Sequence, residues 1–138
     1  FDVAKQFENI DVRLAIGIGV KTYQSDKITE SNGSAFVNSG ECFESLKKNT
    51  LAIKTPWENF DIMMNIMLDL ALITMNDWST KSANLVKIGL ENPEINQIEL
   101  ANLLDKTQST ISEGLKRAAF DELLKMIDFY SQKISEKC

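Results

Sequence analysis

The chain has 138 residues, of which 43% are hydrophobic and 25% are charged. This composition is typical of a globular protein with one domain or two small ones. The net charge of -5 argues against general binding of polyanions, because such binding depends on clustered Lys and Arg. Histidine is absent, which excludes a Ser–His–Asp triad and an HExxH zinc site.

The two cysteines, Cys42 and Cys138, form no CxxC pair. Zinc ribbons and thioredoxin-type redox motifs are therefore excluded. No positively charged segment followed by an apolar run stands at the start of the sequence, so no signal peptide is visible. We expect a cytoplasmic protein with reduced cysteines and without a bound metal or cofactor.

The first residues predict a short helix followed by a strand. Apolar side chains at spacings of three and four in residues 1–10 are typical of the end of a helix. Larger apolar side chains recur at every second position from Val12 to Val20, which predicts a strand over residues 12–23. Gly17 and Gly19 occupy its second face, so we expect a neighbouring backbone or helix to pack closely there.

A loop, a helix and a second strand are expected next. Asn32 and Gly33 are a turn signal, and residues 34–48 have the apolar spacing of a helix. The apolar segment 50–55 is a plausible partner for the first strand. Residues 1–54 are thus predicted to be a partial α/β unit.

A long helix with a clear start signal is predicted over residues 56–76. Thr55 suits the N-cap, Pro56 suits the first helical position, and Glu58 completes a T-x-x-E capping box.

Most of the circumference of this helix is apolar. Ten of the twelve residues from 62 to 73 are apolar, and only Asn65 and Asp69 interrupt them. The uninterrupted run is too short for a membrane span. The helix must therefore be buried by the rest of the chain or by a second copy, and its methionines are more typical of an adaptable core than of a binding groove.

The remainder of the chain is predicted to be helical. Ser79 or Thr80 is expected to cap one helix, which is followed by helices over 95–104, 108–119 and 121–135. The predicted fold is α+β and mostly helical: a strand–helix–strand unit, a long helix, and a three-helix unit with a C-terminal helix. A winged-helix-like form of the three-helix unit is an alternative. The predicted divisions are 1–54, 55–78 as a connecting helix, and 79–138.

One segment, residues 97–118, has the pattern of a helix-turn-helix. Ala101 is small enough for two helices to cross closely, and Asp105 tolerates the left-handed backbone that the turn requires. Ile111 and Leu115 stand at helical spacing in the second helix and are expected to face inward.

The other side chains of the second helix suit DNA. Gln pairs with adenine, and Ser or Thr reaches several bases or phosphates. The expected base contacts are Gln108, Ser109, Thr110 and Ser112, and the expected phosphate contacts are Lys106, Lys116 and Arg117. Glu113 is also expected to point outward. The segment 106–117 carries a local net charge of +2 within an acidic chain, so DNA binding is expected to be weak per copy and dimeric.

Several segments together resemble the SatD family of bacterial proteins. The likeness is carried by RLAIGIG, by NGSAFVNSGECFESLKK, by the apolar helix with W-S-T-K after it, and by IELANLLDKTQSTISEGLKRA. The resemblance implies that residues 1–54 belong to a degenerate, ferredoxin- or nucleotidyl-cyclase-like α/β unit that precedes a helix-turn-helix. It also implies a regulatory role. It also implies that further strands with the metal-binding carboxylates precede residue 1, so we expect no catalysis by this chain.

The sequence therefore favours a bacterial, non-enzymatic, DNA-binding transcriptional regulator that dimerises through the methionine-rich helix 56–76. The alternative is a protein–protein interaction module in which the helix-turn-helix is architectural. A third possibility is nucleotide sensing by the α/β part, although Gly17 and Gly19 stand inside a strand and not at a strand-to-helix turn.

Overall fold

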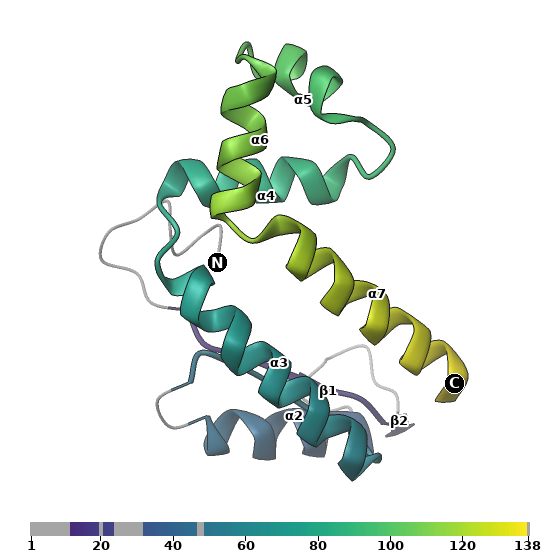
Figure 1. Cartoon of the computed structure of the whole chain (residues 1–138). Coiled ribbons are helices and arrows are strands. Elements are labelled where there is room, and N and C mark those ends of the chain that lie inside the picture. Colours follow the sequence, from purple (N-terminus) through teal and green to yellow (C-terminus); the bar gives the residue numbers. More distant parts are fainter. Residues whose placement is uncertain (1–11, 20, 24–31, 47–48, 138) are drawn as a thin grey trace. The chain divides into compact units, whose positions relative to one another are not determined.

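The computed structural model describes residues 12–19, 21–23, 32–46 and 49–137 (Figure 1). The fold is α+β and mostly helical, as predicted. Its elements, in chain order, are β1 (Leu14–Gly17), β2 (Lys21–Tyr23), β3 (Asn32–Gly33), α2 (Ser34–Ser45), β4 (Leu51–Lys54), α3 (Glu58–Asn76), α4 (Thr80–Glu91), α5 (Gln97–Leu103), α6 (Gln108–Arg117) and α7 (Phe120–Lys137). The helix predicted over residues 1–10 lies outside the described residues.

The central strands β1 and β4 are parallel, with Ile16 beside Ile53 in the register. The chain passes from β1 to β4 through α2, which contacts both strands. Parallel neighbours need such a crossover, usually a helix. The predicted helix and its partner strand are therefore confirmed, and residues 24–31 of the predicted loop lie outside the described residues.

Two details of this region were predicted wrongly. Residues 12–23 are not one strand, because β1 ends at Gly17 and β2 belongs to a separate antiparallel pair with β3. Asn32 and Gly33 form β3 and are not a turn. Gly33 has φ 146° and directly precedes α2, so this glycine supplies the backbone conformation that leads from the strand into the helix.

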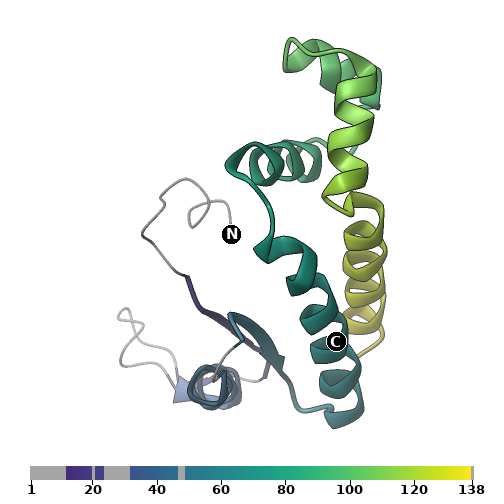
Figure 2. The ribbon, with the colours of Figure 1, turned by 60° about the vertical axis from the view of Figure 1, so that its left-hand side comes forward.

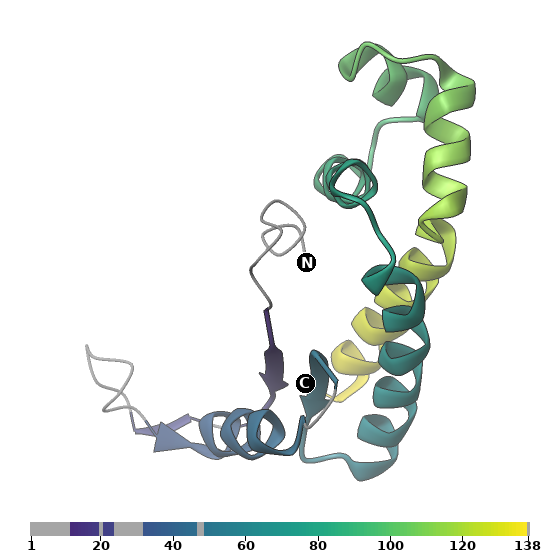
Figure 3. The same cartoon turned by 90° about the vertical axis from the view of Figure 1, so that its left-hand side faces the viewer.

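Gly17 and Gly19 allow α2 to approach the backbone at the end of β1 closely, as predicted. A Cβ atom on Gly17 would lie 2.4 Å from both the Ala35 carbonyl oxygen and the Ser39 nitrogen. A Cβ atom on Gly19 would lie 2.5 Å from the nitrogen of Ala35. Asn38 of α2 donates a 2.8 Å hydrogen bond to the carbonyl oxygen of Ile18. The backbone of residues 17–19 thus packs directly against α2 (Figure 3).

The start of α3 differs from the predicted capping box. The helix begins at Glu58, so Thr55 and Pro56 precede it. The Thr55 hydroxyl accepts a 3.0 Å hydrogen bond from the nitrogen of Trp57. The carboxylate that reaches back is that of Asp61, which accepts bonds of 3.0 Å from the Thr55 nitrogen and 2.7 Å from its hydroxyl. The T-x-x-E spacing identified the region of the start, but the partner of Thr55 lies one helical turn further on.

A row of polar side chains on α3 borders strand β4. Asn65 accepts a 2.9 Å hydrogen bond from the nitrogen of Ile53 and donates one of 2.9 Å to its carbonyl oxygen. Asp69 accepts a 2.7 Å bond from the side chain of Asn49. Together with Asp61 these residues recur every four positions, so they lie on one face of the helix. The residues that interrupt the apolar run therefore attach α3 to the edge of β4.

The described residues form two compact units, residues 12–72 and residues 73–137. The boundary falls inside α3, whereas the predicted divisions at 54/55 and 78/79 remain predictions. In the second unit α4, α5 and α6 pack together and α7 follows α6 (Figure 2). Residues 73–137 contain helices and no strand, so this unit carries no β-wing.

The helices of the second unit begin and end close to the predicted positions. Ser79 is the N-cap of α4, and its side chain accepts a hydrogen bond from the nitrogen of Ser82. The break between the helices predicted over 108–119 and 121–135 lies at Ala119, which has φ 56° between α6 and α7. Within the described ranges, no helix is both long and apolar enough to cross a membrane.

Candidate nucleic-acid interface

Helix α5 and the turn after it are held by local hydrogen bonds. The side chain of Asn96 accepts bonds from the nitrogens of Ile98 and Glu99, and Glu99 accepts a 2.8 Å bond from the nitrogen of Asn96. This is a complete capping box. The sequence interpretation did not single out Asn96, although the N-x-x-E spacing was a visible signal.

The turn between α5 and α6 has the geometry of a Schellman C-cap. Asp105 has φ 51°, as expected from its tolerance of the left-handed region. The nitrogen of Lys106 donates a 2.9 Å bond to the carbonyl oxygen of Ala101, and the nitrogen of Asp105 donates one of 3.3 Å to that of Asn102. These two bonds satisfy carbonyls at the end of α5 and set the direction in which the chain enters α6.

Behind this turn lies a small apolar core. The four buried residues are Leu100, Ala101, Ile111 and Leu115, and partly buried side chains of α4, α7 and the segments on either side of α5 pack around them. The three expected to face inward, Ala101, Ile111 and Leu115, are exposed by 3%, 2% and 6%. A Cβ on Gly114 would lie 2.7 Å from a terminal methyl of Leu85, so this glycine gives α4 and α6 close contact.

Helix α6 presents an exposed polar surface. Its N-cap, Thr107, accepts a hydrogen bond from the nitrogen of Thr110. The residues expected to contact bases, Gln108, Ser109, Thr110 and Ser112, are all exposed, and so are Lys106, Glu113, Lys116 and Arg117. With about 100° of rotation per residue, these side chains do not all share one face.

The helical positions divide the predicted contacts into two groups. Ser109, Ser112 and Lys116 lie between about 100° and 160° from Ile111 around the helix axis, on the side away from the core. Thr110 and Arg117 lie on the flank that faces α4. The Thr110 hydroxyl is 2.8 Å from that of Thr107, so it takes part in the helix start. The structure therefore places two of the predicted DNA contacts apart from the others.

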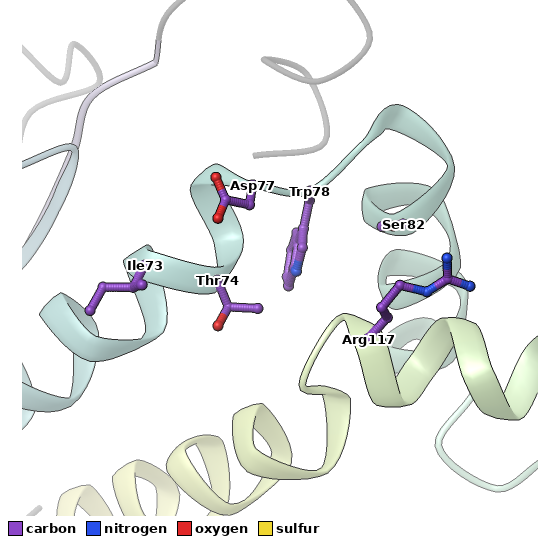
Figure 4. A pocket seen from close by; sticks show the side chains of 6 residues that line it. All are labelled: Ile73, Thr74, Asp77, Trp78, Ser82 and Arg117. Atoms are coloured by element: carbon purple, nitrogen blue, oxygen red, sulfur yellow. The ribbon is translucent and has the colours of Figure 1, made fainter.

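Arg117 borders a cavity of about 290 Å³ inside the second unit (Figure 4). The cavity is lined by Ile73, Thr74, Asp77, Trp78, Ser82 and Arg117. In Figure 4 the guanidinium of Arg117 lies on the side of Ser82, and the indole of Trp78 stands between α3 and α6. The indole nitrogen of Trp78 donates a 3.2 Å bond to the carbonyl oxygen of Ala118. Trp78 thus links the end of α3 to the end of α6, a role that no local pattern signals.

The first unit offers little room for a phosphate. The space beside Gly17 and Gly19, where a phosphate loop would need free backbone nitrogens, is filled by the first turns of α2. Among the residues that the structure describes, no three His, Cys, Asp or Glu side chains gather in a way that could hold a metal ion.

Comparison of the chain with protein-family models, with curated proteins and with solved structures finds no match. The functional interpretation therefore depends on the geometry of α4, α5 and α6 alone.

Proposed function

We propose that α4, α5 and α6 form a helix-turn-helix that binds DNA, and that the chain is a non-enzymatic transcriptional regulator of the SatD type, located in the bacterial cytoplasm. The observation that carries this proposal is the exposure of Gln108 in the first turn of α6, together with that of Ser109 and Ser112 farther from the core. They are exposed polar side chains on a helix that is held firmly from behind by Ile111 and Leu115. An α-helix fits the major groove, where such side chains reach base edges.

The charges near α6 predict how the protein binds. Lys106 and Lys116 are exposed close to the polar side chains of α6 and suit phosphate contacts, and Arg117 extends this set on the flank facing α4. So few cations contribute little non-specific affinity for DNA. Two copies on one DNA double the number of contacts, which supports a dimer on a site with two half-sites.

The test is selection of bound duplexes from a library of bacterial promoter fragments at low salt. We expect one enriched motif, and we expect Gln108→Ala to weaken binding to it by about 1–3 kcal/mol. Gln132→Ala is the matched control, because Gln132 is exposed on α7. A library that yields no sequence preferred over bulk DNA would contradict the proposal.

A second candidate function is self-association through α3, and a specific observation favours it. Met63, Ile66, Leu70 and Ile73 are exposed by 45%, 56%, 63% and 66%. Their spacing of three, four and three residues is that of a coiled-coil seam. No charged residue stands among these four positions, so the same seam on a second copy would fit it without charge repulsion.

Light scattering distinguishes this candidate. A lysine at Leu70 should convert a dimer into a monomer without loss of helical circular dichroism, whereas Asn59→Lys, at an exposed position of the same helix, should leave the dimer intact. An oligomeric state that does not respond to Leu70→Lys would exclude the seam as the interface.

A further inference from the structure

Glu113 is exposed among the side chains of α6 that the proposed function assigns to DNA. Counting about 100° per residue, it lies about 200° from Ile111, which is 2% exposed, and so points away from the core. Ser109 precedes it by four residues and Lys116 follows it by three, so both are its neighbours on the helix surface.

The carboxylate of Glu113 has no structural role within the unit. Across the described ranges, no hydrogen bond or ion pair engages this side chain. It does not cap a helix, because the N-cap of α6 is Thr107. A negative charge on this surface is repelled by the DNA phosphates, so it weakens binding unless it makes a specific contact.

Only some base edges can provide such a contact. In the major groove cytosine and adenine present amino groups that donate to a carboxylate, but adenine also presents its N7 acceptor, which repels one, so Glu or Asp suits cytosine. Guanine and thymine present carbonyl oxygens at the corresponding position, which repel a carboxylate. A glutamate facing the groove therefore favours cytosine and opposes the two oxo bases.

We propose that Glu113 is a specificity-determining residue that accepts a hydrogen bond from the amino group of a cytosine in the major groove, and that its charge lowers affinity for other sequences. This inference rests on the proposed DNA-binding function. Glu113 lies five residues after Gln108, so the two side chains point about 140° apart around the helix axis and would contact different bases.

The experiment is selection from random duplexes with three forms of the full chain: the wild type, Glu113→Gln and Glu122→Gln. Glu122 is exposed on α7, so its substitution makes the same change of charge away from α6. We expect the wild type to require cytosine at one position. Glu113→Gln should reduce that preference about tenfold and shift it toward adenine, because Gln pairs with adenine, and it should bind a scrambled duplex several-fold more tightly. Glu122→Gln should keep the wild-type motif.

The outcomes separate the two proposals. A motif that Glu113→Gln leaves unchanged at every position overturns the role of Glu113 while the DNA-binding function stands. A wild-type motif without a required cytosine has the same consequence. Absence of any enriched motif for the wild type overturns both.

Discussion

The carboxamide of Asn65 bonds both the nitrogen and the carbonyl oxygen of Ile53, each over 2.9 Å. One side chain of α3 thereby imitates the hydrogen bonding of a neighbouring strand along the edge of β4. Unpaired strand edges invite pairing with other chains, and the row of Asp61, Asn65 and Asp69 closes this one with a helix.

Replacing Asn65 by alanine should therefore destabilise the first unit. The substitution leaves the backbone groups of Ile53, which is 3% exposed, without partners, and this costs about 1–3 kcal/mol. Urea denaturation followed by circular dichroism measures the loss. Asn59→Ala, at an exposed position of the same helix, should change the free energy of unfolding by less than about 0.5 kcal/mol. Equal effects of the two substitutions would contradict the role of Asn65.

Two glycines of the first unit should respond to alanine in opposite directions. A methyl group on Gly17 meets backbone atoms of α2 at 2.4 Å, and the resulting overpacking should cost about 1–3 kcal/mol or more. Gly40 lies within α2 with no atom near its missing Cβ, so Gly40→Ala should gain up to about 1 kcal/mol. Thermal unfolding of the two variants measures the sign of each change in stability. A Gly17→Ala protein as stable as the wild type would rule out the close approach of α2.

The junction between α6 and α7 allows a stabilising substitution. Ala119 has φ 56°, a conformation that costs a residue with a Cβ about 1–2 kcal/mol. Ala119→Gly should raise the free energy of unfolding by about 0.5–1 kcal/mol, after the greater freedom of glycine in the unfolded chain is subtracted. The adjacent Ala118 has φ -79° and is 1% exposed. Ala118→Gly should therefore lower stability by about 1–2 kcal/mol, and a loss at both positions would argue against the left-handed turn.

Cys42 should be unreactive in the folded protein. Burial raises the pKa of its thiol above the ordinary range, and the negative charge of Asp61 raises it further, against an opposing effect of Lys54. A thiol reacts as its thiolate, so labelling of a Cys138→Ser variant by a chromogenic aromatic disulfide at pH 8 should be slow. Labelling should become fast in urea, where the pKa returns to its ordinary value. Fast labelling without urea would show that Cys42 is accessible.

The pH dependence of stability follows from the same shift. The pKa of Cys42 is raised in the folded protein. The thiol's contribution to the free energy of unfolding is therefore complete below the ordinary thiol pKa, and it decreases as the pH rises through the pKa of the folded protein. Comparing urea denaturation of the protein and of Cys42→Ser between pH 7 and pH 10 isolates this contribution. The decrease in the free energy of unfolding with pH that the thiol causes should be absent in Cys42→Ser.

Features that depend on neighbours in the chain were predictable. The left-handed Asp105 and the buried Ala101, Ile111 and Leu115 follow from spacing and residue type within one segment, and the parallel pair of β1 and β4 follows from two short apolar runs around a helix. Features that depend on distant residues were not predictable. The partner of Asn65 lies on β4, and the left-handed residue at the end of α6 is an alanine, which gives no local signal for that conformation.

The candidate interface shows the same limit. Residue type and periodicity identified every exposed polar position of α6, but the sides on which they lie depend on which residues face α4. Arg117 turns toward the cavity beside Ser82, because Gly114 brings α4 against that flank of the helix. Glu113 was predicted to be exposed, but it entered the prediction only through the local net charge of residues 106–117 and not as a base contact.

The two tryptophans of the chain are shared equally between the two units, Trp57 in residues 12–72 and Trp78 in residues 73–137. A Trp57→Phe protein would therefore have a single indole fluorophore, whose nitrogen is bonded to the end of α6. Its emission would report on the helical unit alone. The fold thus contains its own optical probe, with which movements of the proposed recognition helix could be followed without any attached dye.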